Sequence, residues 1–259
     1  MSAKSLRRNQ CLGAVDVLVL AGGLGTRIRP VLGDTPKLLA PIRDRPFLLY
    51  LLRWLACFGA RRVVLALGHA AAAVQDYLRD VPDSPLELIT VVEPRPLGTA
   101  GAVRFARAQL RSDPVLVMNG DSFVDADLCQ FLAFHRNAGA TGTVLCARVE
   151  HAGRYGRIAI DENARIGGFV EKDAALQGPA TVNAGVYLLS GALLDAIIAM
   201  PGPSLERDVF ECLPAGSLAA FGGPFGFIDI GTPETLATAA TVLAPLFEVL
   251  PGVETESRG

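Results

Sequence analysis

The first half of the chain alternates short apolar runs with amphipathic stretches, and this alternation constrains the fold more than any other feature. The apolar runs are rich in Val, Ile and Leu and span residues 15–20, 62–67, 86–92 and 115–119. Runs of this length and composition are typical of parallel strands buried on both faces. The stretches between them predict helices over residues 46–58, 70–79 and 99–110. Such alternation predicts a mostly parallel sheet with helices on both faces.

The second half of the chain has strands at shorter spacing. They are expected over residues 143–149, 156–160, 166–171, 186–190, 218–221 and 225–230, and the last two are expected to close the sheet. The turn residues 161–164 predict a hairpin between the second and third of these strands. Helical stretches are expected over residues 191–200, 205–212 and 233–243. We therefore predict a single mixed α/β domain of Rossmann-like type over residues 15–245, with a flexible leader at 1–14 and a polar C-terminal tail at 246–259.

Charge and hydropathy exclude two classes of protein. The 259 residues carry a formal net charge of -2, whereas a nucleic-acid-binding surface normally needs a basic excess. No segment reaches the ~18 uninterrupted apolar residues of a membrane span. The sequence therefore predicts neither a nucleic-acid partner nor a membrane anchor.

The cysteines and histidines show no metal-site spacing. The cysteines are scattered without a CxxC pair, at Cys11, Cys57, Cys129, Cys146 and Cys212. This scatter predicts buried, reduced thiols in a cytoplasmic protein, because disulfides are rare in the cytosol. The histidines match no catalytic pattern and are expected on the surface or in loops; they are His69, His135 and His151.

A glycine-rich loop follows the first predicted strand directly. It reads Leu20-Ala21-Gly22-Gly23-Leu24-Gly25-Thr26-Arg27. Glycines remove side chains where a backbone must approach a ligand closely, and successive amides in such a loop form a concave anion site. Arg27 adds a charged fork suited to phosphate, and Lys37 adds a second cation. The loop therefore predicts a phosphate-binding site.

The loop differs from two other phosphate-binding patterns, and a turn without a ligand is a third alternative. A Walker loop needs GxxxxGK[ST], which is absent. A dinucleotide fingerprint needs a third glycine, where this loop has an arginine in the turn, so a nicotinamide-dependent dehydrogenase is disfavoured. A tight strand-to-helix turn without a ligand stays open, although Arg27 and Lys37 argue against it.

The run GGLGTRIRP, followed by TPK, closely resembles the signature of the sugar-nucleotide pyrophosphorylases, which are sugar-1-phosphate nucleotidyltransferases. The resemblance covers residues 15–240 and implies the nucleotide-diphospho-sugar transferase fold. It implies a Mg²⁺-dependent enzyme that joins a nucleoside triphosphate to a sugar 1-phosphate and releases pyrophosphate, and it leaves a homo-oligomer open. By this resemblance the triphosphate is bound by Leu20, Ala21, Gly22, Gly23, Gly25 and Thr26.

The segment from Glu93 to Gly101 resembles the base-recognition loop of the family, with Leu97, Gly98 and Thr99 beside the base. A carboxylate only accepts hydrogen bonds. Guanine offers two adjacent donors, whereas uracil and thymine offer one donor between acceptors, so Glu93 favours GTP. The alternative is a solvent-exposed glutamate beside a proline turn, which is the commoner situation.

Two aspartates fit the metal-binding positions of the family. Asp121 ends the run Asn119-Gly120-Asp121 after a buried strand, where open α/β sheets place ligands. Asp229 lies in Phe227-Ile228-Asp229-Ile230-Gly231 and matches the second aspartate. Two carboxylates together with phosphate oxygens and water suit Mg²⁺. Either aspartate alone could be a turn or cap residue. The nearby Asp127 is expected to be the N-cap of the helix that follows it.

The sugar-binding residues are likewise implied by resemblance, and they are Asn119, Gly156, Glu171, Asn183 and Gly185. Lys172 would hold the sugar phosphate, while Arg27 and Lys37 hold the triphosphate. Glu171 and Lys172 could instead be an ordinary charged strand end, and Asn183 a turn residue.

The sugar-phosphate oxygen would attack the α-phosphorus in line, so the site has to align and neutralise two polyanions rather than supply a nucleophile.

The order of motifs, including Ser204-Leu205-Glu206-Arg207-Asp208, is most similar to D-glycero-α-D-manno-heptose 1-phosphate guanylyltransferases, with mannose-1-phosphate guanylyltransferases close behind. The resemblance implies a place in nucleotide-sugar synthesis for cell-surface polysaccharides such as lipopolysaccharide. A UTP or dTTP enzyme and a non-catalytic nucleotide-sugar sensor stay open, and a hexapeptide-repeat β-helix is not expected.

Overall fold

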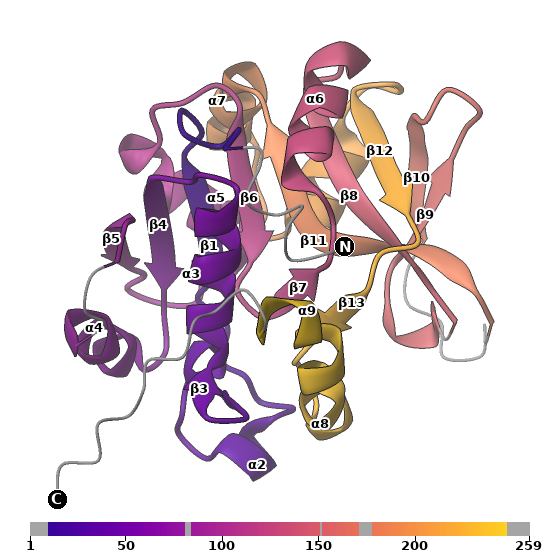
Figure 1. Ribbon diagram of the computed structural model, residues 1–259. Helices are drawn as coiled ribbons and strands as arrows, with labels where there is room; N and C mark the ends of the chain where they lie inside the picture. Colours follow the sequence, from indigo (N-terminus) through magenta and orange to yellow (C-terminus); the bar gives the residue numbers. More distant parts are fainter. Residues whose placement is uncertain (1–9, 81–83, 151, 171–177, 248–259) are drawn as a thin grey trace, which may run out of the picture.

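The computed structural model describes residues 10–80, 84–150, 152–170 and 178–247 of the chain (Figure 1). Its main sheet has a parallel half, in the order β6-β1-β4-β5. These strands are Val115–Asn119, Val17–Ala21, Arg62–Leu67 and Glu87–Val92. The bounds of β4 and β6 agree with the sequence prediction to the residue, because both strands are continuous apolar runs buried along almost their whole length.

The other half of the main sheet is largely antiparallel. The long strand β11 (Ala180–Leu189) lies between β6 and β8 (Gly142–Val149) and is antiparallel to both. The hairpin predicted at residues 161–164 is confirmed, because it joins β9 (Arg157–Ile160) to β10 (Ile166–Val170). The strand β12 (Leu218–Gly223) adds to the outer edge of β8 in parallel. The prediction of a mixed, mostly parallel sheet in one Rossmann-like domain is confirmed.

Helices cover both faces of the sheet (Figure 1). Alternate side chains of β1 point to opposite faces, as in any strand: Val17 and Val19 join one hydrophobic core, whereas Leu18 and Leu20 join the other. The first core is completed by α3 (Phe47–Cys57), α4 (Ala71–Asp80), α6 (Leu128–Ala138) and α8 (Pro233–Val242). The second core is completed by α5 (Gly98–Ala106) and α7 (Gly191–Ala199). Short helices occur at α2 (Arg29–Leu32), α9 (Ala244–Phe247), η1 (Lys37–Leu39), η2 (Arg107–Gln109) and η3 (Ala152–Arg154).

Two small strand pairs lie outside the main sheet. One is the hairpin of β2 (Pro41–Ile42) and β3 (Arg45–Pro46). The other joins β7 (Ser122–Val124) to β13 (Phe227–Asp229). The sequence prediction that residues 225–230 close the main sheet is therefore wrong, because this strand finds its partner in the loop after β6.

The prediction of buried, reduced cysteines is wrong for three of them, because Cys212 is exposed and two others are not reduced. Cys11 and Cys129 form a disulfide, with their Cα atoms 5.6 Å apart, a separation that suits a disulfide. Their positions are 118 residues apart in the chain, so no local spacing could indicate the pair. The argument from reduced thiols to a cytoplasmic protein no longer holds. Within the described residues, no helix is long and apolar enough to cross a membrane.

Three further expectations are refined by the structure. The described part of the leader contacts the domain, since Leu12 is 1% exposed and its amide donates to the Phe58 carbonyl. His135 is buried rather than on the surface, and its Nδ1 lies 2.8 Å from the Thr143 hydroxyl; burial lowers the pKa of this imidazole. The helix expected at residues 205–212 is a π-helical turn, η4 (Leu205–Val209), followed by the 3-10 turn η5 (Phe210–Cys212).

Candidate active site

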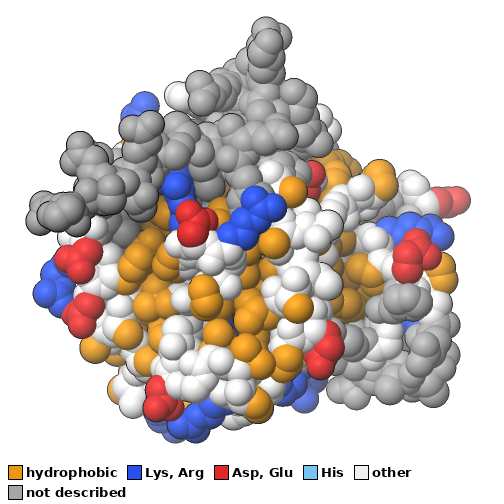
Figure 2. Space-filling view, turned by 60° about the horizontal axis from the view of Figure 1, so that its bottom comes forward, with side chains coloured by type: hydrophobic (Ala, Val, Ile, Leu, Met, Phe, Trp, Pro, Cys, Tyr) orange, Lys and Arg blue, Asp and Glu red, His pale blue; other side chains and the backbone are white. Residues whose placement is uncertain are grey.

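The carboxyl ends of the parallel strands meet at the lower edge of the sheet in Figure 1. Figure 2 views this edge and shows apolar side chains across its middle, with charged side chains mostly at the margins. Open α/β sheets bind ligands at this edge, because the strands end there and their loops diverge. Two adjoining cavities open here, and we call them the glycine-loop pocket and the polar pocket.

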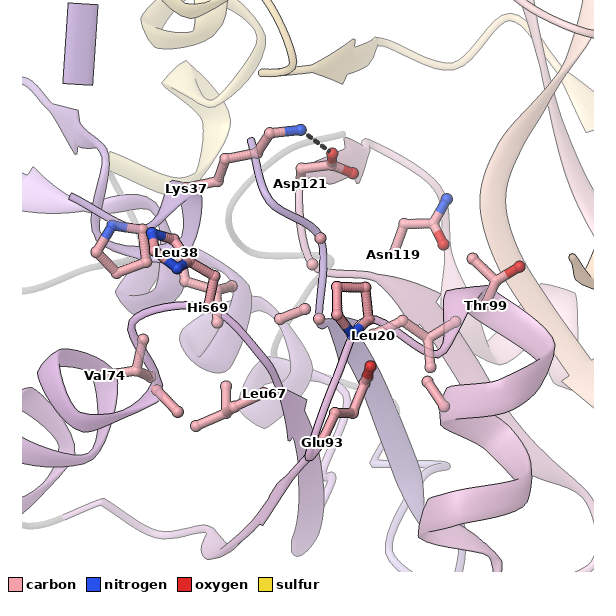
Figure 3. Close-up of a pocket in the computed structure, with 18 of the residues that line it drawn as sticks. Leu20, Lys37, Leu38, Leu67, His69, Val74, Glu93, Thr99, Asn119 and Asp121 are labelled. Atoms are coloured by element: carbon pink, nitrogen blue, oxygen red, sulfur yellow. Dashed lines mark hydrogen bonds and ion pairs between the residues drawn. The ribbon is translucent and has the colours of Figure 1, made fainter. Parts of the chain in front are cut away.

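The glycine-loop pocket has a volume of about 290 Å³. It lies between the ends of β1, β4 and β6 and the start of α5 (Figure 3). Its lining includes the predicted nucleotide-binding residues Leu20, Ala21, Gly22, Gly23, Glu93, Gly98 and Thr99. Gly25 lines a small adjoining cavity, and Leu97 lines a shallow hollow on the other side of its loop. Thr26 lines none of these cavities in the described structure.

Glu93 is buried in the glycine-loop pocket, so the alternative of an exposed glutamate is wrong. The residue is 6% exposed, and its Oε2 accepts a hydrogen bond from the Leu97 amide at 3.0 Å. Its Oε1 is buried and has no hydrogen-bond partner among the described residues. Burial raises the pKa of this carboxyl, and the Leu97 amide partly offsets the rise. In Figure 3 the carboxylate points into the pocket from below. An unsatisfied buried acceptor in a cavity indicates a ligand that donates hydrogen bonds.

Gly22 must be glycine for Glu93 to occupy this position. A Cβ atom at residue 22 would lie 2.3 Å from Glu93 Oε1, well inside contact distance. At Gly23 a Cβ atom would meet nothing within 4 Å, so the two neighbouring glycines serve different purposes. Gly22 makes room for a protein carboxylate, whereas Gly23 leaves open space in the pocket wall.

Lys37 and Asp121 form an ion pair at the top of the same pocket (Figure 3). The Lys37 ammonium donates to Asp121 Oδ2 at 2.7 Å, and both side chains are partly buried. Lys37 begins η1, and Asp121 follows β6. The structure thus brings together a cation and an acid that the sequence placed in separate motifs.

The polar pocket has a volume of about 550 Å³ and lies beside the glycine-loop pocket. Asn119 and Asp121 line both cavities. Arg27 and Asp229 also line the polar pocket, so the cation of the glycine loop faces the second cavity rather than the first.

The pairing of β7 with β13 brings the two predicted metal ligands together. Asp229 lies opposite Ser122 in the strand pair, and the Ile230 amide donates to the Asp121 carbonyl at 2.9 Å. Burial raises the pKa of the Asp229 carboxyl, and the negative charge of Asp121 raises it further. Lys37 and Arg27 partly offset this effect, as does the Gly231 amide, which donates to Asp229 Oδ1.

The acid pair fits a divalent cation held jointly with ligand oxygens. The charge of Asp121 contributes to the raised pKa of Asp229, so the two carboxylates lie close enough to repel each other. Oxygen donors are those that Mg²⁺ prefers, and this ion usually takes only one or two protein carboxylates beside phosphate and water. No cluster of three or more metal-ligating side chains occurs among the described residues.

Four predicted sugar-binding residues line the polar pocket, namely Asn119, Gly156, Asn183 and Gly185. Gly185 has φ of 72° and lies where the register of β11 shifts. A Cβ atom there would lie 2.5 Å from Asn119 Nδ2, so the glycine lets the Asn119 amide approach β11. Asn119 Oδ1 is buried without a partner among the described residues. Glu171 and Lys172 lie outside the described residues.

Sequence reasoning missed Glu206 as a site residue. Its Oε1 accepts from the Tyr187 hydroxyl at 2.8 Å and its Oε2 from the Ser204 hydroxyl at 3.1 Å. The Asn183 amide also donates to the Tyr187 hydroxyl at 2.9 Å. Glu206 belongs to the motif that begins at Ser204, and the sequence of that motif gives no indication of this network. Other lining residues that were missed include His69 in the glycine-loop pocket and Ser122, Tyr155, Phe169, Arg207, Glu211 and Phe227 in the polar pocket.

The fold and the two joined cavities define an α/β protein with a glycine-loop ligand site and a second polar site, bridged by an acid pair. The nucleotidyl transferase family model matches residues 16–244. The chain therefore belongs to the nucleotidyl transferase family, as the sequence resemblance predicted.

Relatives and solved structures agree with this family. Mannose-1-phosphate guanylyltransferase catalytic subunit beta of Drosophila melanogaster is 36% identical over 225 residues, which cover 85% of this chain and 60% of that protein. Mannose-1-phosphate guanylyltransferase of Mycobacterium tuberculosis is 35% identical over 228 residues, covering 85% and 62%. The chain thus spans about three fifths of the length of these relatives.

Among crystal structures, HddC from Yersinia pseudotuberculosis is 32% identical, with a TM-score of 0.77, covering 88% of this chain and 98% of that one. The same protein has been solved in complex with GMP-PN, with the same score and coverage. UDP-glucose pyrophosphorylase complexed with UDP-glucose has a TM-score of 0.74 at 18% identity, covering 90% and 98%. At that identity the last comparison supports the fold alone.

Proposed function

We propose that the chain is a sugar-1-phosphate guanylyltransferase, which transfers GMP from GTP to a sugar 1-phosphate and releases pyrophosphate. The observation that carries the proposal is the unpartnered Glu93 carboxylate in the glycine-loop pocket. The family match, the guanylyltransferase names of two relatives and the GMP-PN complex of HddC support it.

Glu93 supports guanine over the other bases. N1–H and the exocyclic amine of guanine are adjacent donors, and a carboxylate accepts both in a bidentate fashion. Cytosine and adenine present an acceptor at the ring nitrogen of the same edge, which a carboxylate repels. Because Glu93 is buried, a base that leaves its carboxylate unpaired loses affinity.

The reaction needs two anionic substrates to be aligned rather than a protein nucleophile. Lys37 lines the glycine-loop pocket and would hold the triphosphate. Arg27 lines the polar pocket, where it would contact the triphosphate on the side of the acceptor. Lys172, outside the described residues, would hold the sugar phosphate. Fixed cations around the reacting centre lower the repulsion between the phosphates and restrict their motion, and both effects accelerate in-line attack.

Asp121 and Asp229 would hold a magnesium ion at the junction of the two pockets. The fit rests on their proximity, on the raised pKa of Asp229 beside Asp121 and on their oxygen donors. A bound Mg²⁺ would supply positive charge to the phosphate oxygens of both substrates. The protein's contribution is to fix the two carboxylates through the pairing of β7 with β13.

The acceptor that we propose first is D-glycero-α-D-manno-heptose 1-phosphate, on the order of sequence motifs described above. Mannose 1-phosphate is the second candidate, and it is favoured by the relatives that carry that name. Both sugars present several hydroxyls. The amide of Asn183 and the carboxylates of Glu206 and Glu211 offer donors and acceptors around the polar pocket.

A pyrophosphate-release screen tests the function directly. The purified chain with Mg²⁺ is offered GTP, UTP, dTTP, CTP or ATP, each with heptose, mannose, glucose or N-acetylglucosamine 1-phosphate. We expect release with GTP and one of the first two sugars. A preference for a pyrimidine nucleotide would remove the guanine proposal. Nucleotide binding without release from any pair would favour the non-catalytic sensor.

A further inference from the structure

The segment of residues 200–206 supports the polar pocket; it leads from the end of α7 into the first residues of η4. The far end of this segment brings Ser204 and Glu206 to the polar pocket. The segment is also held to the rest of η4, because the Ser204 amide donates to Asp208 Oδ2 at 2.7 Å. The position of the segment therefore decides where the Glu206 carboxylate lies.

The segment lies directly on the first turn of α5, which lines the glycine-loop pocket. The Ala100 amide donates to the Pro203 carbonyl and the Leu205 amide to Thr99 Oγ1, each at 2.8 Å. Thr99 also lines the glycine-loop pocket. A Cβ atom at Gly98, where φ is 73°, would lie 2.5 Å from the Pro203 carbonyl oxygen, so only glycine allows this approach.

Arg104, farther along α5, holds the beginning of the same segment. Its Nη1 donates to the carbonyl of Met200 at 3.0 Å and, more weakly, to that of Ile197 at 3.5 Å. Its Nη2 donates to the Gly202 carbonyl. The last carbonyls of a helix have no partner within the helix, and α7 ends at Ala199. A guanidinium can bind several carbonyls at once, because its donors form a rigid fork.

We propose that Arg104 is a positioning residue for the polar pocket, which keeps residues 200–206 seated on α5 so that Glu206 and its neighbours meet the acceptor substrate. Arg104 contacts the segment at its start and not the cavity in which Glu206 lies. Its loss should therefore weaken acceptor binding more than nucleotide binding. The role of the acceptor rests on the proposed function, whereas the seating of the segment does not.

Arg107 provides a matched control. It also connects the end of the α5 region to α7, since its Nε and Nη2 donate to Asp195 Oδ1 at 3.1 and 2.7 Å. It makes no hydrogen bond with residues 200–206 in the described structure. Removing Arg107 takes away a cation and a contact between η2 and α7, while Arg104 still holds the segment.

The first measurement is steady-state kinetics on Arg104→Met, Arg104→Lys and Arg107→Met. For Arg104→Met we expect the KM for the sugar phosphate to rise roughly tenfold or more, because hydrogen bonds from a charged donor are lost. The KM for GTP should stay within about twofold. Lysine retains a charged donor, so Arg104→Lys should give an intermediate value and should fold if the methionine variant does not. Equal changes in both KM values, or a similar effect of Arg107→Met, would overturn the proposal.

The second measurement is hydrogen exchange of the nucleotide-free proteins, followed in peptides that cover residues 200–206. Exchange there should be faster in Arg104→Met than in the wild type and unchanged in Arg107→Met. Unaltered exchange in both variants would refute the anchoring, and faster exchange with an unaltered KM for the sugar phosphate would refute the positioning role. Wild-type protein that turns over no substrate would contradict the proposed function, while hydrogen exchange would still test the anchoring.

Discussion

The Lys37 ammonium lies 2.7 Å from Asp121 Oδ2 and so neutralises one carboxylate of the acid pair in the ligand-free protein. A metal ion would need the same carboxylate, so lysine and metal compete for it. We predict that Lys37→Met binds Mg²⁺ or Mn²⁺ more tightly than the wild type when no nucleotide is present. With GTP, the same variant should lose roughly a hundredfold to a thousandfold in turnover, because a preorganised cation is missing.

Calorimetry with Mn²⁺ and steady-state kinetics measure the two effects of Lys37→Met. Arg29→Met is the control, because Arg29 forms an ion pair with Asp34 at the exposed surface at 2.8 Å, and such pairs contribute little. Metal affinity that does not increase in Lys37→Met would contradict the competition.

Asp229→Asn should lower activity and raise stability together. The ionised Asp229 is partly buried beside Asp121, which repels it; an amide removes this repulsion, and we expect the free energy of unfolding to rise by ~1 kcal/mol without metal. Turnover should fall roughly a hundredfold to a thousandfold. Urea denaturation measures the stability and pyrophosphate release measures the turnover. Asp127→Asn is the control, because Asp127 is the N-cap of α6 and asparagine also caps helices. Near-wild-type turnover would exclude Asp229 as a metal ligand.

Glu93→Gln should change how stability depends on pH. Burial raises the pKa of Glu93 above its ordinary value of 4.5, so the ionised carboxylate costs the folded state stability at high pH. This cost is fully present above the raised pKa and disappears as the pH falls through it. At pH 8 without nucleotide, the glutamine variant should be more stable than the wild type by ~1 kcal/mol.

The stability difference between Glu93→Gln and the wild type should shrink as the pH falls toward 4.5, as denaturation at a series of pH values will show. The same variant should lose most of its preference for GTP, because glutamine places a donor where guanine needs an acceptor. A difference that is constant from acid to alkaline pH would mean that Glu93 is not the titrating group.

Gly22→Ala should destabilise the ligand-free protein, whereas Gly23→Ala should not. The new Cβ atom at residue 22 would overlap the Glu93 carboxylate, while the one at residue 23 meets nothing within 4 Å. We expect Gly22→Ala to lower the free energy of unfolding by ~1–3 kcal/mol, as overpacking does. Combining Gly22→Ala with Glu93→Ala should restore much of this loss. Thermal unfolding of the single and double variants tests the coupling, and additive losses would contradict it.

Much of the fold could be predicted from the sequence because its parallel strands are continuous apolar runs. The bounds of β4 and β6 were correct, and Asp127 caps α6 as its position before the helix indicated, with its side chain accepting from the amides of Cys129 and Gln130. The proximity of Asp121 to Asp229 followed from family resemblance, not from any local pattern.

Contacts between distant residues could not be predicted from local patterns. The Cys11–Cys129 disulfide is such a contact, and so is the Tyr187–Glu206 hydrogen bond that gives Glu206 its place in the polar pocket. Burial of Glu93 also needed the structure, because its neighbours Pro94 and Arg95 are exposed. The same holds for β13, whose sequence suits the main sheet although it pairs with β7.

The short ladder between β7 and β13 makes the proposed metal site a joint product of early and late parts of the chain. A polypeptide released before residue 227 would still carry the glycine loop, Glu93 and Asp121, yet its Asp121 would face Lys37 without a second acid. Such a fragment would contain every residue that lines the glycine-loop pocket, but it would lack the second carboxylate of the proposed metal site. During synthesis, the proposed metal site would therefore be completed last, after all the residues of the glycine-loop pocket had been made.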